Sequence, residues 1–133
     1  QDYYYNYFTE KDGLASNNVY KVIQDQKGYL WFATDSGVSR YDGQTFEEFS
    51  TEDGLTDYEV LSLYEDSKGR IWFETFNGKP CFYFDGKITG FYANGKVEYT
   101  GKYKLNKEHG CWRYFNKEGK LIDKVRYKNG VMQ

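Results

Sequence analysis

Two stretches, Asp25–Gly37 (DQKGYLWFATDSG) and Asp66–Gly78 (DSKGRIWFETFNG), decide the fold of this chain. They share the pattern D-x-K-G-x2-W-F-x-T-x2-G and lie 41 residues apart. The same offset pairs Asp12-Gly13-Leu14 with Asp53-Gly54-Leu55. A period of this length indicates a repeated supersecondary unit that cannot bury its apolar surface alone.

Each repeat has the composition of short strands separated by Asp- and Gly-containing turns. The expected strands are residues 18–24, 29–34 and 44–50 in the first repeat and 59–65 and 70–75 in the second, with a further strand after each Gly turn and hairpin turns at Asp42-Gly43 and Asp85-Gly86. Adjacent strand residues point to opposite faces. The pairs Trp31-Phe32 and Trp72-Phe73 therefore predict sheets covered on both faces, an interpretation we favour over an aromatic ligand platform. Hairpin-linked strands repeated at this period are typical of propeller blades.

The full pattern D-G-L-x4-V-x5-D-x-K-G-x2-W-F-x-T-x2-G, present twice, resembles the two-component regulator propeller repeat. The resemblance covers residues 5–88 and implies antiparallel β-blades of a partial propeller. The repeat is common in the exported sensor regions of hybrid histidine kinases from Bacteroidetes-type bacteria, so the resemblance also implies an exported sensor. Tyr5 and Phe8 fall at the offset of Phe46 and Phe49, so the amino-terminal Tyr run resembles the fourth strand of a preceding blade.

After residue 89 the spacing changes to a chain of short hairpins with an aromatic residue, a polar turn, Gly, Lys and an aliphatic residue. This stretch resembles MORN-type repeats, which are linked to membrane-surface or protein contacts. The expected organisation is residues 1–89 with two propeller-type repeats and an amino-terminal strand, and residues 90–133 with MORN-like hairpins.

The expected strands group into three blades of four. The amino-terminal strand joins three strands of the first repeat, and residues 44–50 join three of the second. The third blade combines residues 87–92, 96–104, 110–116 and 120–128. Propellers close with about 4–8 blades. We therefore expect either a homo-oligomer, with a dimer favoured, or a chain that caps its own sheet edges.

Composition excludes several classes of protein. Aromatic residues make up 21% of the 133 residues, which excludes disorder, and no apolar run is long enough for a membrane helix. The net charge of −2 hides an acidic first part (residues 1–89, 8 Lys/Arg and 16 Asp/Glu) and a basic second part (residues 90–133, 10 Lys/Arg and 4 Asp/Glu). The basic residues are scattered among turns, so nucleic acid is not an expected partner. The basic residues therefore form either a solvated face or a docking surface, and the docking partner could include a membrane.

We expect no catalytic residue, metal or cofactor. The lone His109 lies in a turn without an orienting partner, and the chain lacks the ligand spacing of a metal site. Asp25 and Asp66 are interpreted as turn-forming side chains. Cys81 and Cys111 form either a disulfide or two buried free thiols.

Ligand-binding candidates lie in the loop that follows each D-G-L. They are Asn17 and Asn18 in the first repeat, and Asp57 and Tyr58 in the second. Their side chains differ between the repeats while the surrounding framework is repeated, although ordinary solvated turns would look the same. The chain also has surplus tyrosines that suit contact with carbohydrate or protein, namely Tyr3, Tyr4, Tyr5, Tyr7, Tyr20 and Tyr58. The sequence thus predicts a non-enzymatic, periplasmic or secreted sensory module that binds a glycan or a protein. The alternative is a structural self-assembly module without a small ligand.

Overall fold

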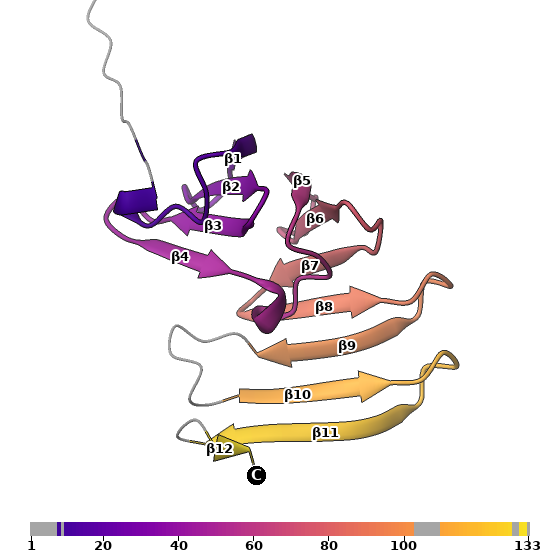
Figure 1. The fold of residues 1–133 in the computed structure, drawn as a ribbon. Helices are drawn as coiled ribbons and strands as arrows, with labels where there is room; N and C mark the ends of the chain where they lie inside the picture. The colour runs from indigo at the N-terminus through magenta and orange to yellow at the C-terminus, as the bar shows by residue number, and fades with distance from the viewer. Residues whose placement is uncertain (1–7, 9, 103–109, 129–130, 133) are drawn as a thin grey trace, which may run out of the picture.

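The computed structural model describes residue 8 and residues 10–102, 110–128 and 131–132, and these residues form two antiparallel sheets (Figure 1). The first sheet contains β1 (Val19–Gln24), β2 (Leu30–Thr34), β3 (Gly37–Tyr41) and β4 (Phe46–Phe49). The second sheet contains β5 (Val60–Glu65), β6 (Ile71–Thr75), β7 (Cys81–Phe84), β8 (Lys87–Phe91), β9 (Val97–Lys102), β10 (Gly110–Phe115), β11 (Leu121–Lys128) and β12 (Val131–Met132). Strands that follow one another in the chain pair within each sheet, so the expected all-β, antiparallel fold is confirmed.

Several hairpins share one turn geometry. In the turn after β1 the Asp25 amide donates to the Tyr29 carbonyl and the Gly28 amide to the Asp25 carbonyl, and Asp66 and Asn116 begin turns with the same two bonds. The fourth residue of the first turn, Gly28, has φ +92°, a conformation that costs Gly nothing. The side chain at the first position caps the turn, so these hairpins are specified by local chemistry.

The grouping of strands differs from the expected three blades. β4 pairs with β3 and completes the first sheet, so residues 44–50 do not join the second repeat. The amino-terminal residues 1–7 and 9, expected to supply a strand, lie outside the described residues. The expectation of a separate third blade is wrong, because β8 pairs with both β7 and β9 and the second sheet continues to β12. The expected division between residues 89 and 90 falls inside β8.

The apolar core lies between the two sheets. Trp31 of the first sheet is 1% exposed and its ring contacts Phe73 and Tyr83 of the second sheet at centroid distances of 5.9 and 5.3 Å. Arg40 also lies there, with its guanidinium 5.3 Å from the Trp31 ring, and it donates to the Tyr83 hydroxyl at 3.1 Å. An ion pair with Glu47 at 2.5 Å satisfies its charge. The first sheet thus packs one face against the second, as expected for neighbouring blades.

Glycines let the second sheet carry large rings on the face turned toward the core. A Cβ at Gly101 would clash with the Trp112 ring, so this ring of β10 lies over β9. A Cβ at Gly90 would clash with the Tyr99 ring, so this ring of β9 lies over β8. The Tyr99 hydroxyl donates to the Gly54 carbonyl in the link between the sheets. These contacts attach β9 and β10 to the propeller-type part of the molecule.

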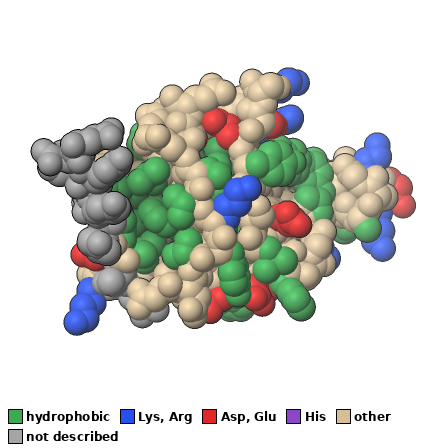
Figure 2. Space-filling model, turned by 90° about the horizontal axis from the view of Figure 1, so that it is seen from above, with side chains coloured by type: hydrophobic (Ala, Val, Ile, Leu, Met, Phe, Trp, Pro, Cys, Tyr) green, Lys and Arg blue, Asp and Glu red, His purple; other side chains and the backbone are tan. Residues whose placement is uncertain are grey.

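The expectation that both faces of each sheet are covered holds only for the first sheet. There Trp31 and Phe32 are 1% and 7% exposed, on opposite faces. In the second sheet Phe73 is 2% exposed on the core side, but Trp72 on the other face is only half-buried. Apolar side chains accordingly reach the surface in several groups with charged side chains between them (Figure 2).

Candidate functional site

The loop that holds Asn17 and Asn18 is fixed to the β2–β3 turn. The Asn18 side-chain amide donates to the Asp35 carboxylate at 2.9 Å, and the Asp35 amide donates to the Asn18 carbonyl. Hydrogen bonds from Ser16 and Asn18 lower the pKa of Asp35 below its ordinary value. Asn17 is exposed beside them. The structure therefore presents the first predicted loop as an ordered polar surface.

The loop that holds Asp57 and Tyr58 is fixed to the β6–β7 turn in a parallel way. The Asn77 amide donates to the Asp57 carboxylate at 3.0 Å, and the Asn77 side chain donates to the Thr56 carbonyl at 2.6 Å. The Thr56 hydroxyl donates to the Lys79 carbonyl at 2.7 Å. Tyr58 projects from this frame with 62% of its surface exposed.

Tyr20 joins the two loops at one end of the molecule. Its hydroxyl donates to the Glu59 carboxylate at 2.7 Å, and this bond raises the pKa of Tyr20 above its ordinary value. We call this surface the loop end; its residues are Asn17, Asn18, Tyr20, Asp35, Asp57, Tyr58, Glu59 and Asn77. It offers two exposed phenol rings, Tyr20 and Tyr58, among side chains rich in acceptor oxygens.

Three residues of the loop end, Asp35, Glu59 and Asn77, were not among the sequence candidates. Asp35 and Asn77 lie in the turns after the repeated residues Thr34 and Thr75, where the two repeats differ as the loops do. That difference between otherwise matching repeats was the available signal. Their proximity to the loops follows from β1 pairing with β2, which brings Asn18 beside Asp35.

The two Asp residues of the repeated pattern are structural, as predicted. Asp66 Oδ1 accepts from the Lys68 and Arg70 amides at 2.9 and 3.0 Å, and Oδ2 accepts from Trp72 Nε1 at 2.9 Å. Burial opposes ionisation of Asp66, but the Trp72 and Arg70 hydrogen bonds outweigh it and lower its pKa. Asp25 holds Trp31 Nε1 in the same way at 2.8 Å.

Cys81 and Cys111 are free thiols in the structure. They lie on β7 and β10, with two strands between them. At about 4.8 Å per strand this separation is roughly 14 Å, beyond the reach of a disulfide. Burial raises the pKa of the Cys81 thiol to about 11, while Cys111 is half-buried rather than buried.

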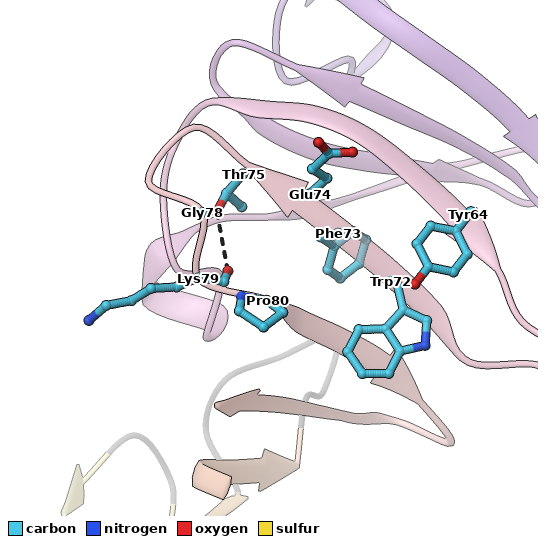
Figure 3. A pocket seen from close by; sticks show the side chains of 8 residues that line it. All are labelled: Tyr64, Trp72, Phe73, Glu74, Thr75, Gly78, Lys79 and Pro80. Atoms are coloured by element: carbon cyan, nitrogen blue, oxygen red, sulfur yellow. Dashed lines mark hydrogen bonds between the residues drawn. The ribbon is translucent and has the colours of Figure 1, made fainter. Parts of the chain in front are cut away.

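A hollow of about 210 Å³ lies beside the loop end, on the face of the second sheet that points away from the core (Figure 3). Tyr64 and Trp72 line one side with nearly parallel rings, 14° apart with centroids separated by 6.5 Å. Glu74 and Lys79 add one charge of each sign, and the Thr75 hydroxyl donates to the Lys79 carbonyl at 3.3 Å. Trp72, which the sequence predicts to be a core residue, instead lines this hollow.

The other predictions are tested in part. His109, Tyr3, Tyr4, Tyr5 and Tyr7 lie outside the described residues. Within the described ranges, His, Cys, Asp and Glu do not gather in groups of three that would hold a metal ion. None of the helical segments in that part of the chain has the length and apolarity to cross a membrane.

Comparison with known proteins identifies the repeat. Residues 13–36 and 54–77 match the family described as Two component regulator propeller. A segment of 40 residues is 42% identical to Histidine kinase P4 of Formosa agariphila, covering 30% of this chain and 3% of that protein. A solved structure, the extracellular domain of a one-component system from B. thetaiotaomicron, is similar over 90% of this chain and 29% of that one, with 12% identity and a TM-score of 0.26. Two segments of the chain thus match a propeller repeat of the two-component regulator type, and the chain spans a small part of these relatives.

Proposed function

We propose that this chain is a non-catalytic, exported sensor module that binds a neutral oligosaccharide at the loop end. The single observation that carries the proposal is the pair of exposed rings, Tyr20 and Tyr58, set among acceptor side chains held by hydrogen bonds. Sugar rings pack on aromatic faces and their hydroxyls donate to carboxylates and amides. The match of two segments to two-component regulator propeller repeats supports a sensory role.

Charge favours a neutral glycan over an anionic one. The loop end holds Asp35, Asp57 and Glu59, and the hydrogen bonds to Asp35 keep that carboxylate ionised. Uronic acid or sulfate groups would meet these carboxylates as like charges, which costs free energy. A neutral oligosaccharide meets only acceptors for its hydroxyl groups.

Calorimetric titration with matched neutral, uronate and sulfated oligosaccharides tests this proposal. We expect binding of at least one neutral member, and at least about a tenfold weaker affinity in Tyr58→Ala because the ring supplies a stacking surface. Phe84→Ala is the control, because Phe84 is an exposed aromatic residue at the far end of β7 from the loop end, and this variant should bind as the unmodified chain does. Equal losses in both variants, or no binding across the neutral set, would contradict the proposal.

The carboxy-terminal hairpins enter this proposal as MORN-like repeats that extend the second sheet. The turns before β9 and β11 share their backbone bonds, with the Tyr92 amide donating to the Lys96 carbonyl and the Asn116 amide to the Lys120 carbonyl. Successive turns are also linked, because the Tyr92 hydroxyl donates to the Phe115 carbonyl at 2.6 Å. Regular, mutually bonded hairpins support a repeat rather than an irregular tail.

A further inference from the structure

The second sheet carries an uncovered aromatic face. We call it the acceptor face; its residues are Tyr64, Arg70, Trp72, Phe82 and Phe91. The Trp72 ring contacts Phe82 and Phe91 at 4.8 and 5.7 Å, and the Arg70 guanidinium lies 5.6 Å from the Trp72 ring. None of these side chains is fully buried. Exposed apolar clusters of this kind mark interaction sites.

The first sheet shows what covers such a face. The strand registers of the two sheets match, so each residue of the acceptor face has an equivalent in the first sheet. Trp31 is equivalent to Trp72, Arg40 to Phe82, and Phe49 to Phe91. In both sheets an Arg guanidinium lies over the Trp ring, but Arg40 and Arg70 occupy different positions in their repeats. In the first sheet this cluster is buried by the second sheet. The covering side chains include Phe73 and Tyr83, which contact Trp31.

The same kind of covering face is present a second time in the chain. The face of the first sheet that points away from the core carries Phe32, Tyr41 and Phe46. These correspond by register to Phe73, Tyr83 and Ile88, the residues of the second sheet that face the core. We call this the donor face. One chain thus has an uncovered acceptor face at one end and a donor face at the other.

We propose that the acceptor face of one copy of this chain docks on the donor face of a second copy, as the first sheet docks on the second within the chain. Tyr41 of the second copy then lies against Trp72 as Tyr83 lies against Trp31, and Phe32 takes the place of Phe73. The contact is head-to-tail, so it either closes into a ring or continues. Two propeller sheets per copy and rings of about 4–8 blades give two to four copies.

Phe8 occupies the donor face in the single chain and competes with docking. Its ring contacts Tyr41 and Phe46 at 4.8 and 5.2 Å, as Phe49 contacts Tyr83 at 5.4 Å. In the assembly this position belongs to Phe91 of the neighbouring copy, which corresponds to Phe49. Docking therefore requires Phe8 to move away, and its removal should favour assembly.

Sedimentation velocity over a concentration series tests the proposal with the full chain. Phe82→Lys breaks the acceptor face and Tyr41→Lys breaks the donor face, and each should raise the dissociation constant at least about tenfold. An equimolar mixture of the two variants should restore association, but only to two chains, because one intact interface remains. Phe76→Lys, an exposed Phe outside both faces, should assemble as the unmodified chain does.

Phe8→Ala provides an independent arm, since it should strengthen association without adding charge. Circular dichroism checks that each variant folds, and Phe82→Ser replaces Phe82→Lys if the latter does not. The proposal is overturned if both the unmodified chain and Phe8→Ala stay monomeric, which would leave the face to another protein. It is also overturned if the mixture fails to associate or if Tyr41→Lys assembles normally. None of these outcomes depends on glycan binding at the loop end.

Discussion

The two tryptophans of the repeated pattern are held by the same aspartate of the pattern but differ in burial. Trp31 and Trp72 each donate Nε1 to the Asp six residues earlier, at 2.8 and 2.9 Å. Each lies beneath an Arg guanidinium. Trp31 is nevertheless sealed between the sheets, while Trp72 remains half-buried beside a hollow. The repeated pattern therefore fixes the position of the ring but not what lies on top of it.

This difference separates a scaffold from a surface. A blade buries its second face only when another blade follows it, and in this chain the second repeat is followed by an extension of its own sheet instead. The contribution of a repeated residue to stability thus depends on which sheet packs against it.

Truncation of the two tryptophans should give unequal losses of stability. Trp31→Ala leaves a cavity between the sheets and should lower the free energy of unfolding by about 3–5 kcal/mol. Trp72→Ala removes a ring with one open side and should cost less than about 2 kcal/mol. Urea unfolding at low protein concentration measures both. Equal losses would show that Trp72 is as enclosed as Trp31.

Adding one methyl group at a glycine of the second sheet should cause the next largest loss of stability. Gly101→Ala places a Cβ against the Trp112 ring, and Gly90→Ala places one against the Tyr99 ring. Overpacking of this kind costs about 1–3 kcal/mol. Thermal unfolding measures the loss, with Gly43→Ala as a control whose Cβ meets open space but whose positive φ carries its own strain. A Gly101→Ala variant as stable as the unmodified chain would mean that Trp112 does not lie over β9.

The Asp66 carboxylate should contribute a pH-dependent part of the stability. Its pKa is lower in the folded chain than the unfolded value of about 3.9, so its contribution is present above that pH and is lost as the pH falls. Between about pH 6 and pH 3 the unmodified chain should therefore lose more stability than Asp66→Asn. Urea midpoints across this range provide the measurement. Trp72→Phe, which removes only the indole donor, should fall between the two, and parallel curves for all three would contradict the prediction.

The two cysteines should differ in their reactivity toward an alkylating reagent, which is the smallest of the expected effects. Burial holds the Cys81 thiol largely protonated at neutral pH, with its pKa raised to about 11, and hides it from reagents. Cys111 is half-buried on β10. We expect slow labelling of Cys111 by iodoacetamide in the folded chain and labelling of both residues in urea, measured by intact mass. A mass two hydrogens lower without reductant would instead indicate a disulfide.

Local features were predictable from the sequence because local chemistry creates them. The turns at Asp25 and Asp66 form where their carboxylates bond the backbone two and four residues later, and the strands begin and end close to the expected residues. Asn18 and Asp57 lie on one surface because each comes just before the first strand of its sheet, and the Tyr20–Glu59 hydrogen bond joins the two strand starts. Their partners Asp35 and Asn77 required the pairing of strands to be known.

The assignment of strands to sheets could not be obtained from a repeat, because a repeat has no unique starting point. A period of 41 residues is the same whether residues 44–50 close one blade or open the next, and only the pairing of β3 with β4 decides between them. The continuation of β8 into β9 was equally hidden, since a turn such as that at Asn94 is as compatible with one sheet as with two.

The sequence by itself determined that this protein consists of repeated antiparallel hairpins with a tryptophan held by an aspartate in each propeller repeat. These features arise from hydrogen bonds between residues a few positions apart, which the chain specifies wherever it folds. The packing of the sheets is what encloses Trp31, leaves Trp72 open and places Cys81 and Cys111 on strands that are not neighbours. Burial and distance depend on which sheets meet, and that choice is made by the packing of surfaces far apart in the chain.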